Sequence, residues 1–160
     1  ARGRRTARLI ETIDRTLARL RGEEQMLSDD ELYEGFPKDK VQAWKKEAQE
    51  RWGDSYAESN RRVRSWTKEK LAAVRAEGER ITGALGAAID RGPDDPHVQA
   101  LVGEFYQHLR HYYEPSPEVF AGLGQMYVEH PDFRARFDGI RPGLAEFLRD
   151  AMARYAAART

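Results

Sequence analysis

The sequence predicts an all-α fold, and two kinds of observation lead to that prediction. Apolar residues recur at spacings of three and four over most of the chain, whereas strand-like alternation never extends beyond a few residues. Helix ends are marked as well. Asp95-Pro96 and Ser116-Pro117 each place a capping side chain directly before a proline at the first helical position. Gly53 follows a predicted helix, at the position where a left-handed cap is common.

The helices expected from these signals occupy most of the chain. A capping box of Ser28 and Glu31 predicts a short helix, which Gly35 and Pro37 interrupt. Thr67 is expected to cap the longest predicted helix after residue 37, which ends near Gly92. The predicted ranges after residue 37 are 38–52, 55–65, 67–90, 96–113, 117–129, 131–138 and 142–157.

Composition narrows the possible functions. The chain has 160 residues, of which 34% are charged and 40% hydrophobic, and these values suit one domain with at most a short appendage. No stretch approaches the roughly 18 apolar residues that a membrane span needs, and the N-terminus has no secretion signal. The formal net charge is zero, which disfavours direct binding to nucleic acid. The absence of cysteine excludes disulfides and thiolate chemistry and fits a cytoplasmic protein.

The N-terminal segment has the pattern of a coiled coil. Ile10, Ile13, Leu17 and Leu20 follow one another at spacings of three, four and three, with charged residues around them. One interpretation is an amphipathic helix that folds onto its own domain. The other is half of an intermolecular coiled coil, which would make the protein a homodimer. The solvated flanks of the stripe favour the second interpretation.

Aromatic residues are abundant, and they allow two interpretations. Rings could simply fill a helical core, which is the expectation for Phe105 and Leu109. Tyrosine and tryptophan also carry polar groups, so a cleft lined with them would suit a flat polyheterocyclic ligand. The candidate ligand-binding residues are Trp52, Tyr56, Trp66, Phe105, Leu109, Tyr112, Tyr113, Phe120 and Tyr127.

Their predicted roles follow from their positions. Tyr112 and Tyr113 diverge by about 100° around a helix axis, so at least one should face the cleft. Phe120 and Tyr127 would present a matching face from the next helix. Phe105 and Leu109 would form the floor. The rings of Trp52, Tyr56 and Trp66 are expected to close over the ligand.

A metal or catalytic site is not expected. Glu104, His108 and His111 lie at i, i+4 and i+7 on one helix face, with His97 further upstream, and this spacing could hold a divalent metal. Solvated histidines are the simpler interpretation, and a haem site has less support still. No glycine-rich phosphate loop, catalytic triad order or HExxH motif is present. We therefore expect no cofactor, no metal and no enzymatic activity.

Several spaced motifs resemble the TipAS family, the antibiotic-sensing domain at the C-terminus of MerR-type transcription regulators. One is an aromatic pair and turn in residues 112–118 that lead into Leu-Gly-Gln-Met-Tyr-Val at 123–128. The others are Glu-Arg-Trp-Gly at 50–53, His-Pro-Asp-Phe at 130–133 and Pro-Gly-Leu-Ala at 142–145. The similarity covers about residues 28–157. It implies a globin-like helical bundle with a cleft for bulky antibiotics, which are thiopeptides in the founding case.

The resemblance also implies a division of the chain. Residues 27–160 would form the ligand-binding domain, with an N-terminal portion that orders over the ligand. Residues 1–26 would be the end of a dimerising coiled-coil helix. DNA would be reached only through a domain absent from this chain. The alternative is a helical dimerisation or protein-interaction module without a small-molecule ligand.

One position departs from the family pattern. Founding members capture thiopeptides through a cysteine in the turn after the aromatic pair, and Pro115 stands at that place here. Because the chain has no cysteine, it cannot form a thioether with a ligand. Binding is therefore expected to be reversible and non-covalent.

Overall fold

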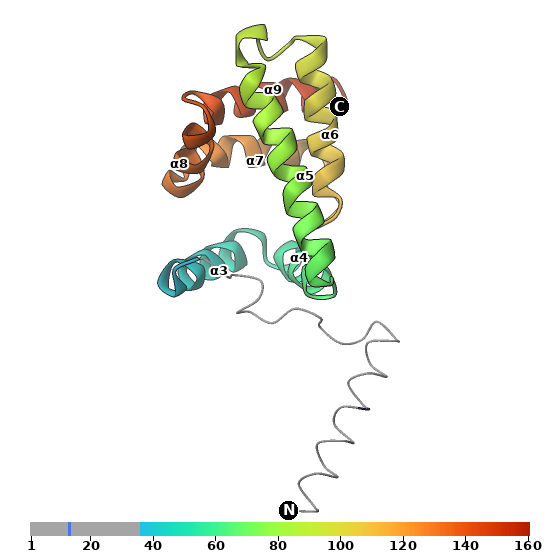
Figure 1. Ribbon diagram of the computed structural model, residues 1–160, viewed down its shortest axis with the longest axis vertical. Helices are drawn as coiled ribbons and strands as arrows, with labels where there is room; N and C mark the ends of the chain where they lie inside the picture. The colour runs from blue at the N-terminus through green and yellow to red at the C-terminus, as the bar shows by residue number, and fades with distance from the viewer. Residues whose placement is uncertain (1–12, 14–35) are drawn as a thin grey trace, which may run out of the picture. The chain divides into compact units, whose positions relative to one another are not determined.

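The structure is a computed structural model that describes residue 13 and residues 36–160, and within these residues it contains helices and no strand (Figure 1). The all-α prediction is confirmed. The elements are α3 (Lys38–Trp52), α4 (Asp54–Arg64), α5 (Lys68–Ala87), the 3-10 helix η1 (Ile89–Arg91), α6 (Pro96–Leu109), α7 (Pro117–Glu129), α8 (Pro131–Ile140) and α9 (Leu144–Ala157).

The chain divides into two compact units, Ala1–Ala72 and Ala73–Thr160. In the described part of the first unit, α3 packs against α4, and Gly53 separates them with a positive φ of 44°. That conformation favours glycine, which explains why the helix predicted over 38–52 ends where it does. The buried apolar residues of this part are Val41, Val63, Trp66 and Leu71.

The core of the second unit lies where α7 packs against α9, with α6 and α8 also in contact with α9. At Gly124 of α7 an added Cβ would lie 3.1 Å from the Arg149 Cα and 3.3 Å from the Met152 Sδ of α9. Glycine therefore permits the close approach of the two helices. Side chains that are almost fully buried here include Phe120, Ile81, Leu85, Leu144, Leu148, Met152, Val98 and Val102.

The predicted capping residues open their helices as expected. The Asp95 carboxylate accepts hydrogen bonds from the backbone N–H groups of His97 and Val98, and Ser116 accepts one from Val119. Each capping residue precedes a proline at the start of α6 or α7. These caps satisfy backbone donors that would otherwise lack partners in the first helical turn.

Several predicted boundaries differ from the structure. The helix expected over 67–90 ends at Ala87 and is followed by η1, and the helix expected over 131–138 extends to Ile140. The helix expected to reach residue 113 ends at Leu109, because the backbone N–H groups of Tyr112 and Tyr113 both bond to the Leu109 carbonyl in a tight turn. The last helix begins at Leu144 rather than at residue 142, since Gly143 adopts a left-handed φ of 88° just before it.

The predicted coiled coil falls mostly outside the described residues. Ile13 is helical and half exposed, whereas Ile10, Leu17 and Leu20 are not among the residues that the structure describes. Dimerisation through this segment stays a prediction. Among the described helices, none is both long enough and apolar enough to span a bilayer.

Candidate ligand site

The turn between α6 and α7 carries the predicted aromatic pair. Tyr112 and Tyr113 are both half-buried in this turn, and burial raises the pKa of each phenol. The turn is anchored by Tyr106, whose hydroxyl donates a hydrogen bond to the Pro115 carbonyl. The Tyr106 ring packs edge-on against Phe120 at 5.0 Å, which ties the turn to the core of the second unit.

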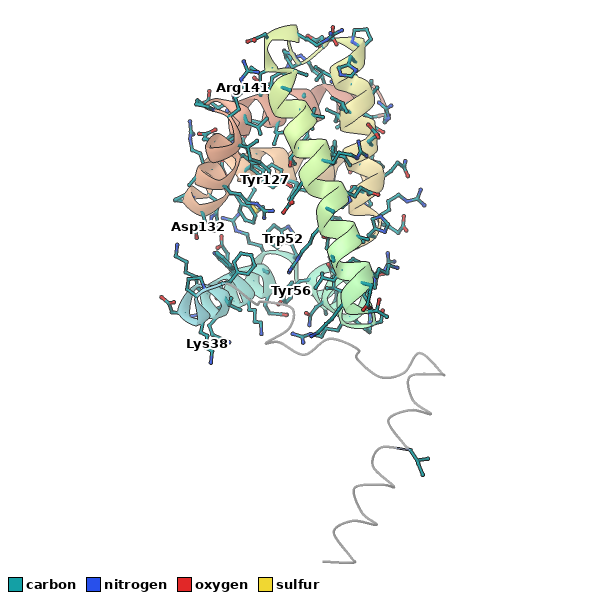
Figure 2. All side chains as sticks on the ribbon, viewed as in Figure 1. Lys38, Trp52, Tyr56, Tyr127, Asp132 and Arg141 are labelled. Atoms are coloured by element: carbon teal, nitrogen blue, oxygen red, sulfur yellow. The ribbon has the colours of Figure 1, made fainter. Side chains whose placement is uncertain are left out.

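Tyr127 of α7, labelled in Figure 2, combines a packed ring with a hydroxyl close to the aromatic pair. Its ring lies 4.5 Å from that of Phe137 and 5.7 Å from that of Phe133, both on α8. Burial raises the pKa of the Tyr127 hydroxyl strongly, and the nearby Tyr113 and Tyr112 add to that effect while Arg136 opposes it. Tyr112, Tyr113 and Tyr127, named here the tyrosine group, are therefore close enough for their charges to influence one another.

Phe105, Leu109 and Phe120 lie in the core. Their exposed fractions are 5%, 8% and 0%, so the core interpretation holds for Phe105 and Leu109. Phe120 is enclosed by the rings of Phe105, Tyr106 and Tyr155 at 5.0–6.1 Å. All three side chains belong to the hydrophobic core of the second unit, as Tyr127 does.

The predicted aromatic residues of the first unit differ in exposure. Trp52 is 38% exposed at the end of α3, and Tyr56 of α4 is half-buried (Figure 2). Trp66 is buried, and the Lys70 ammonium lies 5.2 Å from the centroid of its ring. Trp52 is therefore the ring of the three with the most surface available to a ligand.

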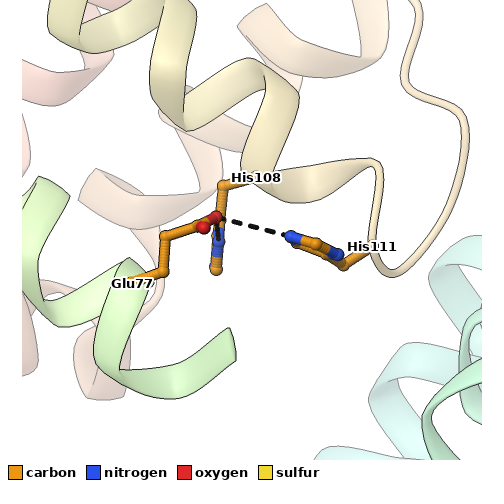
Figure 3. A group of neighbouring side chains, drawn as sticks. All are labelled: Glu77, His108 and His111. Carbon is orange, nitrogen blue, oxygen red and sulfur yellow. Dashed lines mark hydrogen bonds and ion pairs between the residues drawn. The ribbon is translucent and has the colours of Figure 1, made fainter. Parts of the chain in front are cut away.

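The histidines of α6 are not arranged as expected. His108 was expected to be solvated, but it is only 6% exposed, and its Nδ1 lies 2.7 Å from Oε1 of Glu77 on α5 (Figure 3). That hydrogen bond is the largest influence holding the pKa of Glu77 below its usual range. His111 Nε2 lies 3.4 Å from the same oxygen, whereas Glu104 pairs with Arg80 at 3.3 Å. We call Glu77, His108 and His111 the Glu–His–His cluster.

Packing against a glycine explains the burial of His108. A Cβ added at Gly78 would lie 2.9 Å from the His108 Nε2, so only a glycine leaves room for the ring against α5. The cluster opens onto a pocket of about 530 Å³. Its other lining residues are Arg80, Ile81, Gly103, Glu104 and Gln107.

Some residues of these sites could not be found from sequence spacing. Glu77 lies on a different helix from the histidines, 31 residues before His108, and Arg136 belongs to α8. Tyr106 was not among the candidate ligand-binding residues, although its hydroxyl fixes the turn. The contact of Gly78 with His108 could have indicated a buried histidine, but only once α5 was known to pack against α6.

A comparison with protein families matches residues 44–155 to the model of the TipAS antibiotic-recognition domain. The chain belongs to the TipAS family. It is 34% identical over 167 residues to the HTH-type transcriptional regulator SkgA of Caulobacter vibrioides, covering 99% of this chain and 65% of that protein. It is 31% identical to the HTH-type transcriptional activator mta of Bacillus subtilis, covering 92% of this chain and 59% of mta. The chain thus spans less than two thirds of the length of these relatives.

A solved structure agrees with this assignment. The structure of TipAS from Streptomyces lividans in complex with the thiopeptide nosiheptide matches with a TM-score of 0.70 and 28% sequence identity. The match covers 86% of this chain and 99% of that one. The globin-like helical fold predicted from the resemblance is therefore confirmed. The matched family is an antibiotic-recognition domain and not a family of enzymes.

Proposed function

We propose that this chain is the effector-binding domain of a MerR-type transcription regulator and senses bulky polyheterocyclic or peptide antibiotics. The observation that carries the proposal is the structural match to TipAS bound to nosiheptide, which extends over 86% of this chain. The family model, which describes an antibiotic-recognition domain, supports it independently.

The tyrosine group is the proposed centre of the ligand site. Tyr112 and Tyr113 keep part of their surface exposed on a turn that Tyr106 anchors, so their rings can stack on a flat ligand. The Tyr127 hydroxyl beside them can offer a hydrogen bond, and the exposed Arg136 contributes a positive charge. Phe105, Leu109 and Phe120 would hold these rings in place without touching the ligand directly. We further propose that Trp52 and Tyr56 contribute ligand contacts, as the sequence predicts, whereas the buried Trp66 would contribute only after a rearrangement.

Binding would be reversible. The chain contains no cysteine, and the turn after the aromatic pair carries Pro115, whose carbonyl is held by Tyr106. No nucleophilic thiol is thus available to add to an electrophilic ligand. Affinity must come from ring stacking, hydrogen bonds and apolar burial alone.

The regulator as a whole would be a cytoplasmic dimer that reaches DNA through another domain. The relatives are HTH-type regulators that extend beyond the region matched here, and the zero net charge of this chain gives it no general attraction to phosphates. The stripe of Ile10, Ile13, Leu17 and Leu20 would form the dimer contact.

A binding experiment tests the proposal. Nosiheptide and a chemically broad panel of antibiotics are titrated into the protein while heat of binding and tryptophan fluorescence are measured. We expect at least one member to bind reversibly, with the protein mass unchanged after dialysis. Tyr113→Ala should weaken that binding by about thirtyfold, the loss expected for a desolvated stacking ring.

The matched control is Val119→Ala, which shortens an exposed residue of α7 outside the tyrosine group and should leave affinity unchanged. If no member of the panel binds, a protein-interaction module becomes the better description. If both variants bind like the original chain, the ligand site lies elsewhere.

A further inference from the structure

The Glu–His–His cluster brings three metal-ligating side chains together from two helices. Glu77 comes from α5, His108 from α6, and His111 from the turn that follows α6 (Figure 3). One ligand atom from each residue lies within 4.8 Å of the other two. The Glu77 Oε1 is central, at 2.7 Å from His108 Nδ1 and 3.4 Å from His111 Nε2.

These atoms have the chemistry and nearly the spacing of a zinc site. Two imidazole nitrogens and one carboxylate oxygen, with an open fourth position, form a donor set that Zn²⁺ commonly binds. With bonds of about 2.0–2.1 Å, two ligands of a tetrahedral ion lie roughly 3.3 Å apart. The His111–Glu77 separation is close to this value, and the His108–Glu77 pair would need to open by about 0.6 Å. The two histidine nitrogens lie within 4.8 Å of each other, so His111 would need to move towards His108 when the ion binds.

Packing fixes the His108 side chain, whereas the other two metal-ligating side chains, Glu77 and His111, are accessible to solvent. The His108 ring is buried, stacks on Phe105 at 6.5 Å and meets Tyr112 edge-on at 5.8 Å, so its orientation is fixed by packing. Glu77 and His111 are 42% and 37% exposed, which allows an ion to enter and both side chains to adjust. A prepositioned ligand reduces the ordering that binding requires.

The adjoining pocket can complete the coordination. Its volume of about 530 Å³ leaves room for water beside the three ligands. Arg80 lines the same pocket and would repel a cation, but the Glu104 carboxylate lies 3.3 Å from its guanidinium and offsets that charge. The local charge balance is therefore compatible with a divalent cation.

We propose that Glu77, His108 and His111 bind one Zn²⁺ ion per chain, with water in the remaining position. The neutral His108 imidazole would ligate through Nδ1, with its proton moved to Nε2. The bound ion would join α5 to the turn that carries Tyr112. This inference is independent of the proposed antibiotic site, because it requires no ligand there.

The test is a titration of the untagged, metal-free chain with Zn²⁺ at about pH 7.5, where free histidine is largely neutral. Co²⁺ serves as a spectroscopic probe, because tetrahedral nitrogen and oxygen coordination gives strong visible bands. We expect one ion per chain. His111→Ala and Glu77→Gln should each weaken binding by at least about tenfold, since even residues outside the coordination sphere change metal affinity by about 10–100-fold.

The matched control is His97→Ala, which removes an exposed histidine from the same helix and should leave metal binding unchanged. The two test variants replace partly exposed side chains, and circular dichroism verifies that they remain helical. A wild-type chain that takes up neither Zn²⁺ nor Co²⁺ overturns the proposal. Equal binding by the wild type, His111→Ala and Glu77→Gln overturns it as well.

Discussion

The Tyr106 hydroxyl donates a hydrogen bond to the Pro115 carbonyl, and this side-chain contact ties α6 to the end of the turn that presents Tyr112 and Tyr113. The Tyr106 ring also lies 5.4 Å from that of Tyr155 on α9, so the turn is linked to the centre of the second unit. The positions of the proposed ligand-binding rings therefore depend on a side chain that need not touch the ligand.

Removing that hydroxyl should affect both stability and binding. In Tyr106→Phe the ring packing remains while the Pro115 carbonyl loses its donor. We expect the free energy of unfolding to fall by about 1 kcal/mol, the usual net worth of such a bond, and antibiotic affinity to fall as well. Urea denaturation and titration measure the two effects. Tyr155→Phe, which deletes a hydroxyl from the neighbouring ring, is the control, and equal losses in both variants would contradict the role of Tyr106.

Two substitutions at Tyr127 should distinguish the contribution of its ring to stability from the contribution of its hydroxyl to ligand binding. Its ring is only 6% exposed and packs on Phe137 and Phe133, so Tyr127→Ala should lower the free energy of unfolding by about 3–5 kcal/mol. Tyr127→Phe keeps the ring and should change stability by less than about 1.5 kcal/mol while weakening antibiotic binding. Denaturation and calorimetric titration report these quantities. Unchanged affinity in Tyr127→Phe would remove its hydroxyl from the proposed site.

The same hydroxyl predicts a loss of stability in alkali. Burial raises the pKa of Tyr127 in the folded chain, whereas an unfolded tyrosine ionises near a pKa of about 10. The contribution of the neutral Tyr127 hydroxyl to the free energy of unfolding is therefore fully present below about pH 10. It decreases at higher pH, because the unfolded state releases a proton that the folded state retains. Melting temperatures between pH 9 and 11 should fall less steeply in Tyr127→Phe. Parallel curves for the two proteins would show that another group dominates.

Two glycines of α5 should respond oppositely to alanine. At Gly78 a Cβ would lie 2.9 Å from the His108 Nε2, so Gly78→Ala should displace the ring and cost roughly 1–3 kcal/mol of stability. At Gly83 the added Cβ would meet no heavy atom within 4 Å among the described residues beyond its own helix backbone, and Gly83→Ala should stabilise the helix by about 0.5–1 kcal/mol. Thermal denaturation compares them directly. A stabilised Gly78→Ala would mean that His108 moves aside without cost.

The dimerisation prediction can be tested in the intact chain. Replacing Ile13 and Leu17 with glutamine should give a monomer by light scattering, while helical content of the domain is retained. Ile13 is half exposed on a helical backbone, so its replacement alone should leave the fold intact. Replacement of Val119, another exposed apolar residue, is the control. Persistent dimers in the double variant would place the interface elsewhere.

Much of the fold was predictable because its helix starts depend on local chemistry. The side chains of Asp95 and Ser116 accept hydrogen bonds from backbone N–H groups two or three residues later, so a segment of four residues is enough to predict each helix start. The end of α6 was harder to predict, because Tyr112 and Tyr113 continue the apolar periodicity beyond Leu109 while the backbone turns. Periodicity alone does not distinguish a helix from a turn that buries the same side chains.

The sites were only partly predictable for the same reason. Tyr112 and Tyr113 are neighbours in the turn after α6, so their pairing follows from the order of the chain. Tyr127 lies near the end of α7, and its approach to the pair depends on how the helices pack. The partner of His108 does not follow from the order of the chain either, because spacing along α6 favoured Glu104 as the carboxylate. The packing of α5 against α6 brought Glu77 instead and directed Glu104 to Arg80.

Pro115 has a consequence for the timing of a response. A sensor that forms a covalent bond with its drug keeps that drug until the protein molecule itself is replaced. A chain without any thiol releases its ligand at the dissociation rate of non-covalent contacts. On the proposed function, this regulator would therefore follow the drug concentration of the moment and return to its resting state once the drug is cleared. Its output would report the present exposure to the drug, whereas that of a covalent sensor would report past exposure.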